Sequence, residues 1–326
     1  MHTAFWWRRR ARLFCALVAW PRLVLLVAVG LAGLPVATPA RSSPPSPAEY
    51  FFGPEKPEAD AEPEPAPEPP VDPLSLFEVR ENRSWVGRIY HYVRSNRDGS
   101  DPERISVFRK SDTDLAVFKA RERCAPAALV TATLDLERFS PSSITGGRLL
   151  PGARVEPFAY LTSNPRLRTL AFQVDLPDRV LAFDVPFQGH PWHLYDFDLA
   201  SLTVMTPYLL EPKTGFSFDL ILSLADPDLP QPIAFLGRAE FTFDGEEYRQ
   251  GLPAYRFRAN GAAFGREEGQ LWLHALEGHI VDVELPRANH LGYRDFKLTL
   301  QSVDDGGPDT WRTYLLAHHY GCPAER

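Results

Sequence analysis

Hydrophobic and polar residues alternate along the chain from Pro232 to Ser302, in five short runs that turn signals separate. Typical turn pairs are Asn260-Gly261 and Glu277-Gly278, and Asp244-Gly245 is expected to end the first run. Period-two runs of this length predict the strands of an antiparallel meander. Each strand has one apolar face and one polar face, so we expect the sheet to cover something on one side only. The runs are Gly237–Asp244, Ala254–Ala259, Gln270–His274, Ile280–Leu285 and Tyr293–Ser302.

The first half of the chain shows the same alternation less regularly. A further strand is expected near the C-terminus, over Trp311–Ala317. The same alternation predicts these strands: Trp85–Val93, Arg104–Phe108, Leu115–Lys119, Ala128–Leu136, Val155–Leu161, Thr169–Val174, Val180–Val185 and Phe216–Leu222.

One segment, Asp198–Leu209, has a helical pattern. Asp198 is a suitable N-cap, Leu199 and Leu202 fall near one face, and Pro207 limits the C-terminus. The fold class that we predict is therefore mainly β. It is a long curved antiparallel meander, a half-barrel or open barrel, with one short helix packed on its apolar face.

The N-terminal region has the composition of an export signal. Five arginines precede or interrupt an apolar stretch from Leu13 to Ala37, and Thr38-Pro39-Ala40 is a suitable cleavage site. Residues 1–40 are interpreted as a signal peptide or an N-terminal membrane anchor, and the two alternatives stay open. Either predicts an exported, periplasmic protein, which an uncleaved segment would tether to the inner membrane.

A spacer and a folded region follow the signal. Residues 41–75 contain eleven prolines and eight acidic residues, a composition that predicts a disordered Pro/Glu-rich spacer. Residues 76–326 are long enough to bury a core of their own, and we predict a single β-rich domain there.

Charge excludes one class of partner. The whole chain has a formal net charge of −7, and removing the five arginines of residues 1–40, which hold no acidic residue, leaves −12. An acidic protein repels phosphate backbones, so no nucleic-acid partner is expected.

The meander resembles an exported bacterial β-sheet domain family of unknown function. The resemblance rests on three segments, Gly269–Leu273, Gly278–Pro286 and Gly292–Leu300, and extends over about residues 84–302. More distantly, the layout is similar to LolA-type half-barrels, whose curved sheet and inner helix enclose a lipid cavity. The resemblance implies a fold and an apolar ligand, and it provides no catalytic residues.

Cysteines are few. Cleavage of the signal would remove Cys15 and leave Cys124 and Cys322. In an oxidising compartment, two cysteines of one domain most economically form a disulfide, which would tie the C-terminal tail to the body of the domain. The alternative is two unpaired buried thiols.

Histidines do not form a recognisable metal motif. His190 and His193 lie three apart, and His274 and His279 flank a predicted hairpin turn. Neither an HExxH sequence nor Cys/His zinc spacing occurs, so His190 and His193 are interpreted as loop residues around Pro191. We expect no metal and no cofactor.

Catalytic motifs are also absent from the sequence, and no catalytic residue is assigned. There is no GxSxG elbow and no glycine-rich phosphate loop. Two carboxylate pairs have simpler interpretations: Asp198 of the pair Asp196/Asp198 as the helix cap, and Asp226/Asp228 as turn residues.

The polar face of the meander offers a further candidate. A groove there would bind an anionic or glycan ligand with Trp272 as a stacking platform, although an ordinary face of cross-strand charge pairs explains the same residues. The other members of this face are Arg256, Arg258, His274, Asp282 and Glu284.

The apolar face is the preferred candidate site. Its side chains either form a sealed core or line a ligand cavity. The candidate lining residues are Phe241, Phe243, Tyr255, Phe257, Leu271, Leu273, Val281, Val283 and Phe296.

Three functions are compatible with these patterns. The first is a non-enzymatic module that binds a lipid or other apolar ligand. The second is an interaction or scaffold domain that docks another envelope protein. The third is a hydrolase, which would require His193 or His274 to meet a carboxylate in a cleft.

Overall fold

The computed structural model describes residues 72–224 and 232–323. The predicted signal or anchor of residues 1–40 lies outside them, as does the spacer up to residue 71 and the pair Asp226/Asp228. The described chain begins with a short 3-10 helix, η1 (Pro73–Leu76), inside the last residues of the predicted spacer. Phe77, which follows η1, is buried in the main core.

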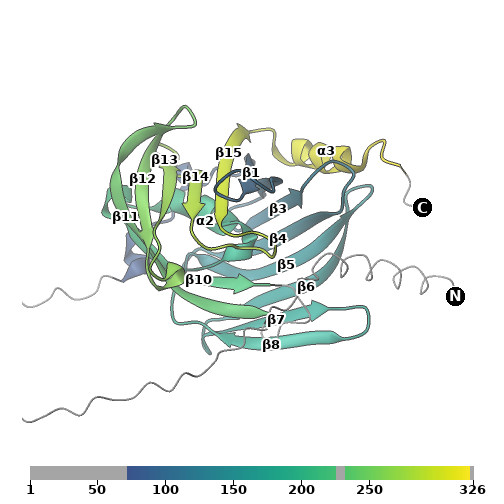
Figure 1. Ribbon diagram of the computed structural model, residues 1–326, viewed down its shortest axis with the longest axis horizontal. Helices are drawn as coiled ribbons and strands as arrows, with labels where there is room; N and C mark the ends of the chain where they lie inside the picture. The colour runs from purple at the N-terminus through teal and green to yellow at the C-terminus, as the bar shows by residue number, and fades with distance from the viewer. Residues whose placement is uncertain (1–71, 225–231, 324–326) are drawn as a thin grey trace, which may run out of the picture. The chain divides into compact units, whose positions relative to one another are not determined.

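Within residues 72–224 and 232–323, fifteen strands form a single sheet (Figure 1). The first strand and the last, β1 and β15, pair at its centre, and one meander runs outward from each. All neighbours are antiparallel except β9 and β10, and the terminal strands β8 and β9 do not pair, so the sheet is not closed into a barrel. This confirms the predicted fold class.

The first meander consists of eight strands: β1 (Ile89–Ser95), β2 (Glu103–Arg109), β3 (Asp114–Ala120), β4 (Ala127–Asp135), β5 (Ser140–Leu150), β6 (Arg154–Asn164), β7 (Thr169–Asp175) and β8 (Val180–Pro186). The second side of the sheet consists of β9 (Trp192–Leu194), β10 (Phe216–Ser223), β11 (Ile233–Arg249), β12 (Leu252–Asn260), β13 (Gly269–His274), β14 (Ile280–Leu285) and β15 (Phe296–Asp304).

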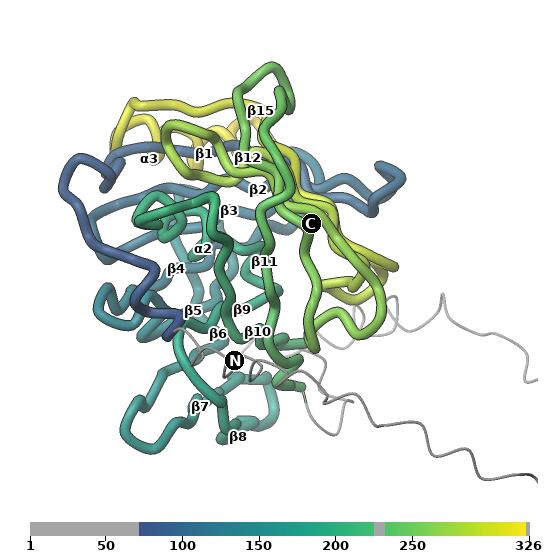
Figure 2. Tube along the Cα trace, turned by 90° about the vertical axis from the view of Figure 1, so that its left-hand side faces the viewer, coloured from purple at the N-terminus to yellow at the C-terminus, as the bar shows by residue number. Residues whose placement is uncertain are grey.

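The predicted helix is present, but it is shorter than predicted and begins at Ala200. It consists of α2 (Ala200–Met205), extended by the 3-10 turn η4 (Thr206–Tyr208), and every residue of both is buried. It lies within the curve of the sheet, as Figures 1 and 2 show, and packs in the main core. The other 3-10 helices of the described residues are η2 (Glu81–Arg83), η3 (Tyr195–Phe197), η5 (Pro212–Thr214) and η6 (Ala262–Phe264).

A second helix corrects one prediction. The segment expected as a strand over Trp311–Ala317 belongs to α3 (Gly307–His319), because Trp311, Leu315 and His318 recur at helical spacing and are the buried residues of one face. Trp311 and Leu315 pack on the outer side of β1–β5, opposite the face that contacts α2.

Two other strand predictions need correction. The run expected to stop at Asp244-Gly245 continues to Arg249, since β11 passes that point with a bulge. Two strands were missed, β5 and β9: β5 carries one proline, three serines and two glycines, which weaken the pattern of a strand, and β9 is only three residues long.

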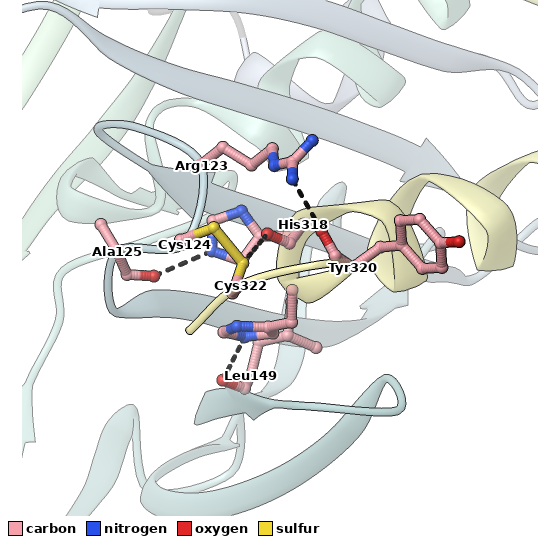
Figure 3. Close-up of a disulfide and its surroundings, with 8 residues drawn as sticks. Arg123, Cys124, Ala125, Leu149, His318, Tyr320 and Cys322 are labelled. Atoms are coloured by element: carbon pink, nitrogen blue, oxygen red, sulfur yellow. Dashed lines mark hydrogen bonds between the residues drawn. A yellow bond between two sulfur atoms is a disulfide. The ribbon is translucent and has the colours of Figure 1, made fainter. Parts of the chain in front are cut away.

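The disulfide prediction is supported, since Cys124 and Cys322 are bonded (Figure 3). The bond joins the β3–β4 turn to the chain just after α3. Hydrogen bonds surround it: His318 Nε2 lies 2.8 Å from the carbonyl oxygen of Ala125, and Arg123 donates to the carbonyl of Tyr320 over 2.7 Å. The helix is thus fastened to the sheet at its C-terminal end.

Candidate functional site

A cavity of about 440 Å³ lies on the inner side of the first meander. Strands β1–β7 form one wall, the segment Leu194–Phe197 forms another, and the loop between β14 and β15 contributes His290, Leu291 and Tyr293. Its volume falls in the range of small-molecule sites. The apolar lining residues are Ala128, Val130, Ile144, Gly146, Phe158, Ala159, Leu161, Phe172, Leu194, Phe197 and Leu224, and the polar ones are Arg94, Glu103, Lys119, Arg121, Tyr160, Asp196 and Ser223.

Small residues explain why this region is hollow. Val130 pairs with Gly146, and Gly146 pairs with Ala159, so these three form a row across β4, β5 and β6. A Cβ added at Gly146 would lie 3.3 Å from the Cβ of Ala159, so the strands are closely spaced and contribute almost no side-chain volume. Larger side chains at these positions would fill the space that the cavity occupies.

The polar end of the cavity is built on a buried carboxylate. Asp198 is fully buried, with Lys119 Nζ 2.6 Å and Arg94 Nη1 3.0 Å from its two oxygens. Asn289 donates to it over 2.8 Å. Burial alone would raise the pKa of Asp198, but Arg94 and Lys119 outweigh burial and hold that pKa below its usual range.

This network corrects the predicted role of Asp198. The side chain of Asp198 does not cap α2, because both Asp198 and Leu199 have left-handed backbone angles (φ 53° and 55°) and the carboxylate turns toward the sheet. The sequence pattern cannot distinguish a capping aspartate from one that pairs with cations on distant strands.

Asp196, the other member of the pair, lines the cavity. Its Oδ1 accepts the backbone N–H of Ser223 over 2.9 Å. Burial raises the pKa of Asp196 to about 7, against the opposing influence of Lys119. Burial also lowers the pKa of His290 well below its ordinary value, so that ring is neutral at neutral pH. The polar end therefore contains a carboxyl that is partly protonated near neutrality.

The nine predicted lining residues lie elsewhere. Eight of them pack in the main core or against it: Phe241, Phe243, Tyr255, Phe257, Leu271, Leu273, Val283 and Phe296. Val281 faces the other way and packs with Ala254 and Trp272, because a bulge between Trp272 and Leu273 shifts the register of β14. None of the nine lines the cavity.

The polar face of the second meander is covered rather than open. Trp272 is only 2% exposed, and the guanidinium of Arg249 lies 4.0 Å above its ring. Arg249 also pairs with Asp282 over 2.6 Å and with Glu284 over 2.8 Å. These contacts are cross-strand charge pairs and leave no free aromatic platform at Trp272.

The histidines proposed for a hydrolase have other partners. His193 belongs to β9 rather than to a loop, is 1% exposed, and its Nδ1 lies 2.8 Å from Ser201 Oγ. His190 contacts Ser140 Oγ over 3.0 Å. Within residues 72–224 and 232–323, neither His193 nor His274 forms a hydrogen bond to a carboxylate oxygen, so the contact that motivated the hydrolase is missing there.

Comparison with known proteins adds no assignment, since no protein-family model and no curated protein matches the chain. The resemblance to exported β-sheet domains and to LolA-type half-barrels therefore stays a prediction. None of the helices in the described part of the chain has the length and apolar character needed to span a bilayer.

Proposed function

We propose that the folded region is an exported, non-enzymatic module that binds a lipid or other apolar ligand, and that residues 1–40 direct it to the periplasm or hold it at the inner membrane. The observation that carries the proposal is the cavity of about 440 Å³. Its walls are apolar over β4–β7, and its charged residues gather at one end, which suits a molecule with an acyl chain and a polar headgroup.

The two ends of the cavity would contact different parts of such a ligand. Side chains such as Ile144, Leu161 and Phe172 offer an apolar surface to a chain. At the other end, Arg121 is exposed and Asp196 and Tyr293 provide hydrogen-bonding groups for a headgroup. Arg94 and Lys119 are already paired with Asp198, so they shape this end more than they attract an anion.

Native mass spectrometry of the protein purified without detergent tests the proposal. We expect a bound mass of lipid size that organic solvent releases. Ala128→Phe places a large ring in the cavity and should abolish this bound mass. Ala171→Phe makes the same change at an exposed position of β7, outside this cavity, and should retain it.

Two outcomes would overturn the proposal. One is a wild-type protein that carries no ligand and takes up no fatty acid or phospholipid from added vesicles. The other is equal uptake by wild type and a folded Ala128→Phe variant.

The alternative is an interaction domain that docks another envelope protein. The observation that favours it is the terminal strand β8, where Val180 is 60% exposed and one edge of the strand has no β-partner in the described sheet. Crosslinking in cells would capture a specific protein through β8, and Val180→Lys would abolish that capture without affecting lipid uptake.

A further inference from the structure

The turn between β13 and β14 brings together three side chains that neither the fold nor the proposed ligand cavity explains. His274, Glu277 and His279 each place one possible ligand atom within 4.8 Å of the others. They occupy the six-residue segment His274-Ala-Leu-Glu-Gly-His279 and share no residue with the cavity. The sequence predicted a turn at Glu277-Gly278 with His274 and His279 on either side of it, but no metal site there.

His279 is the most informative member. Its side chain is 1% exposed, and neither ring nitrogen has a hydrogen-bond partner. Tyr90 and His274 pack on the ring, with centroids 5.1 Å and 4.9 Å away, so the ring is held in place but not satisfied. A buried polar group without a partner is rare and calls for an explanation such as a bound ion.

Glu277 is the carboxylate of this group of three side chains. Its Oε2 lies 3.3 Å from Nδ1 of His279 and 2.8 Å from Nη1 of Arg88. Arg88 has two further contacts: it forms an ion pair with Asp305 over 2.8 Å, and its guanidinium lies 4.0 Å from the centre of the Trp85 ring. Carboxylates that coordinate metals usually have such an outer partner, which fixes their orientation.

His274 is the member that must adjust. Its Nδ1 accepts the backbone N–H of Glu277 over 3.1 Å. Coordination through Nδ1 would use the lone pair that this bond occupies. Coordination through Nε2 would place a proton on Nδ1, facing the amide. Metal binding therefore requires release of the amide of Glu277.

The backbone of the turn is anchored from both sides. Trp85 Nε1 donates to the carbonyl of Glu277 over 3.1 Å, and Arg83 donates to the carbonyl of Leu276. Gly278 has φ 81° and packs so closely on η4 that an added Cβ would lie 2.7 Å from Pro207 Cα. The carbonyls and the glycine thus fix where the three side chains meet.

We propose that His274, Glu277 and His279 bind a divalent transition metal ion of the zinc class. Two imidazole nitrogens and one carboxylate oxygen are the donor set of many zinc sites with three protein ligands, in which water completes the coordination. Such an ion would give one ring nitrogen of His279 the partner that it lacks.

Isothermal titration of the untagged, chelator-treated full-length protein with zinc chloride tests the proposal. We expect one zinc per chain, and substitution of Co²⁺ should give the visible absorption of a four-coordinate ion. His279→Gln and Glu277→Gln should each weaken zinc binding by at least about tenfold. If His279→Gln fails to fold, Glu277→Gln, at a partly exposed position, keeps the test valid.

A matched control uses the other histidine pair. His318→Gln/His319→Gln removes two adjacent histidines near the disulfide and should leave zinc affinity unchanged. Absence of zinc binding to the wild type, or equal binding by wild type and Glu277→Gln, would overturn the proposal. Loss of binding only in the His318/His319 variant would assign the ion to that pair instead. Lipid uptake is measured separately, so failure here leaves the ligand cavity untouched.

Discussion

The two meanders of the sheet curve around the same short helix, yet their interiors differ. In the second meander, large rings interlock: Phe216 and Phe241 stack with centroids 5.0 Å apart, and Phe218 lies 5.2 Å from Phe241. In the first meander, Gly146 and Ala159 occupy neighbouring inward positions and a cavity remains. Alternation along a strand shows which face is buried, whereas side-chain volume decides whether that face is filled.

The outer faces of the two meanders also differ: that of the second is polar, and that of the first is apolar. The second meander covers Trp272 with the guanidinium of Arg249, which pairs with acidic residues of β14. The first meander has an apolar outer face, and α3 covers it with Trp311 and Leu315. The half with the hollow interior is therefore the half that an added helix and a disulfide support from outside.

The largest expected effect is a loss of unfolding free energy that differs between the two interiors. Phe257 is fully buried between Phe216 and Phe243, and Phe257→Ala should lower the free energy of unfolding by about 3–5 kcal/mol, since it creates a new cavity. Phe158 borders an existing cavity and is only partly buried, so Phe158→Ala should cost about 1 kcal/mol. Urea denaturation of both variants measures the difference. Equal losses would show that the first meander is packed as tightly as the second.

The outer support of the first meander is tested through the disulfide. Cys124→Ser/Cys322→Ser should lower the free energy of unfolding by about 2–5 kcal/mol, because the bond closes a long loop and fastens α3. Thermal unfolding with and without reductant measures this, and reductant should have no effect on the variant. Two reactive thiols in unfolded, natively purified wild type would contradict the prediction.

A smaller effect concerns the polar end of the cavity. The pKa of Asp196 is about 7 in the folded state and near 3.8 in the unfolded chain, so the folded state holds this proton more tightly. The stability that results is fully present at low pH and is lost as pH rises toward and past 7. Asp196→Asn should therefore gain stability over wild type, on the order of 1–3 kcal/mol, between about pH 4 and pH 8.

Denaturation of wild type and Asp196→Asn across that range gives the measurement. Asp184→Asn, at an exposed position of β8, is the control and should follow wild type. A constant difference between Asp196→Asn and wild type at every pH would show that Asp196 is not the group that titrates.

The sequence predicted most of the strands because alternation is a local signal. It missed β5, whose proline, serines and glycines obscure that signal, and one of those glycines, Gly146, lines the cavity. It also placed Trp311 in a strand, although Leu315 and His318 continue a helical spacing from it. The lining residues predicted from local patterns lie on the second meander, whereas the cavity lies along the first.

The candidate site depended on information that no local pattern contains. Asp198 meets Lys119 and Arg94 from strands far away in the chain, and this contact decides its role. Arg249 covers Trp272 only because β11 continues past Gly245. A glycine-rich strand next to regular strands was the one sequence signal that could have indicated the hollow.

The pairing of β1 with β15 has a consequence for how the protein is made. Ile89 lies opposite Asp304, so the first strand obtains one of its two neighbours only when the last strand has been synthesised. Until then, a nascent chain carries one edge of β1 unpaired at the middle of the future sheet, which is a site for mispairing with other chains. Any truncation before β15 would leave that edge open permanently, so nonsense mutations late in the gene should yield aggregates rather than shortened working domains.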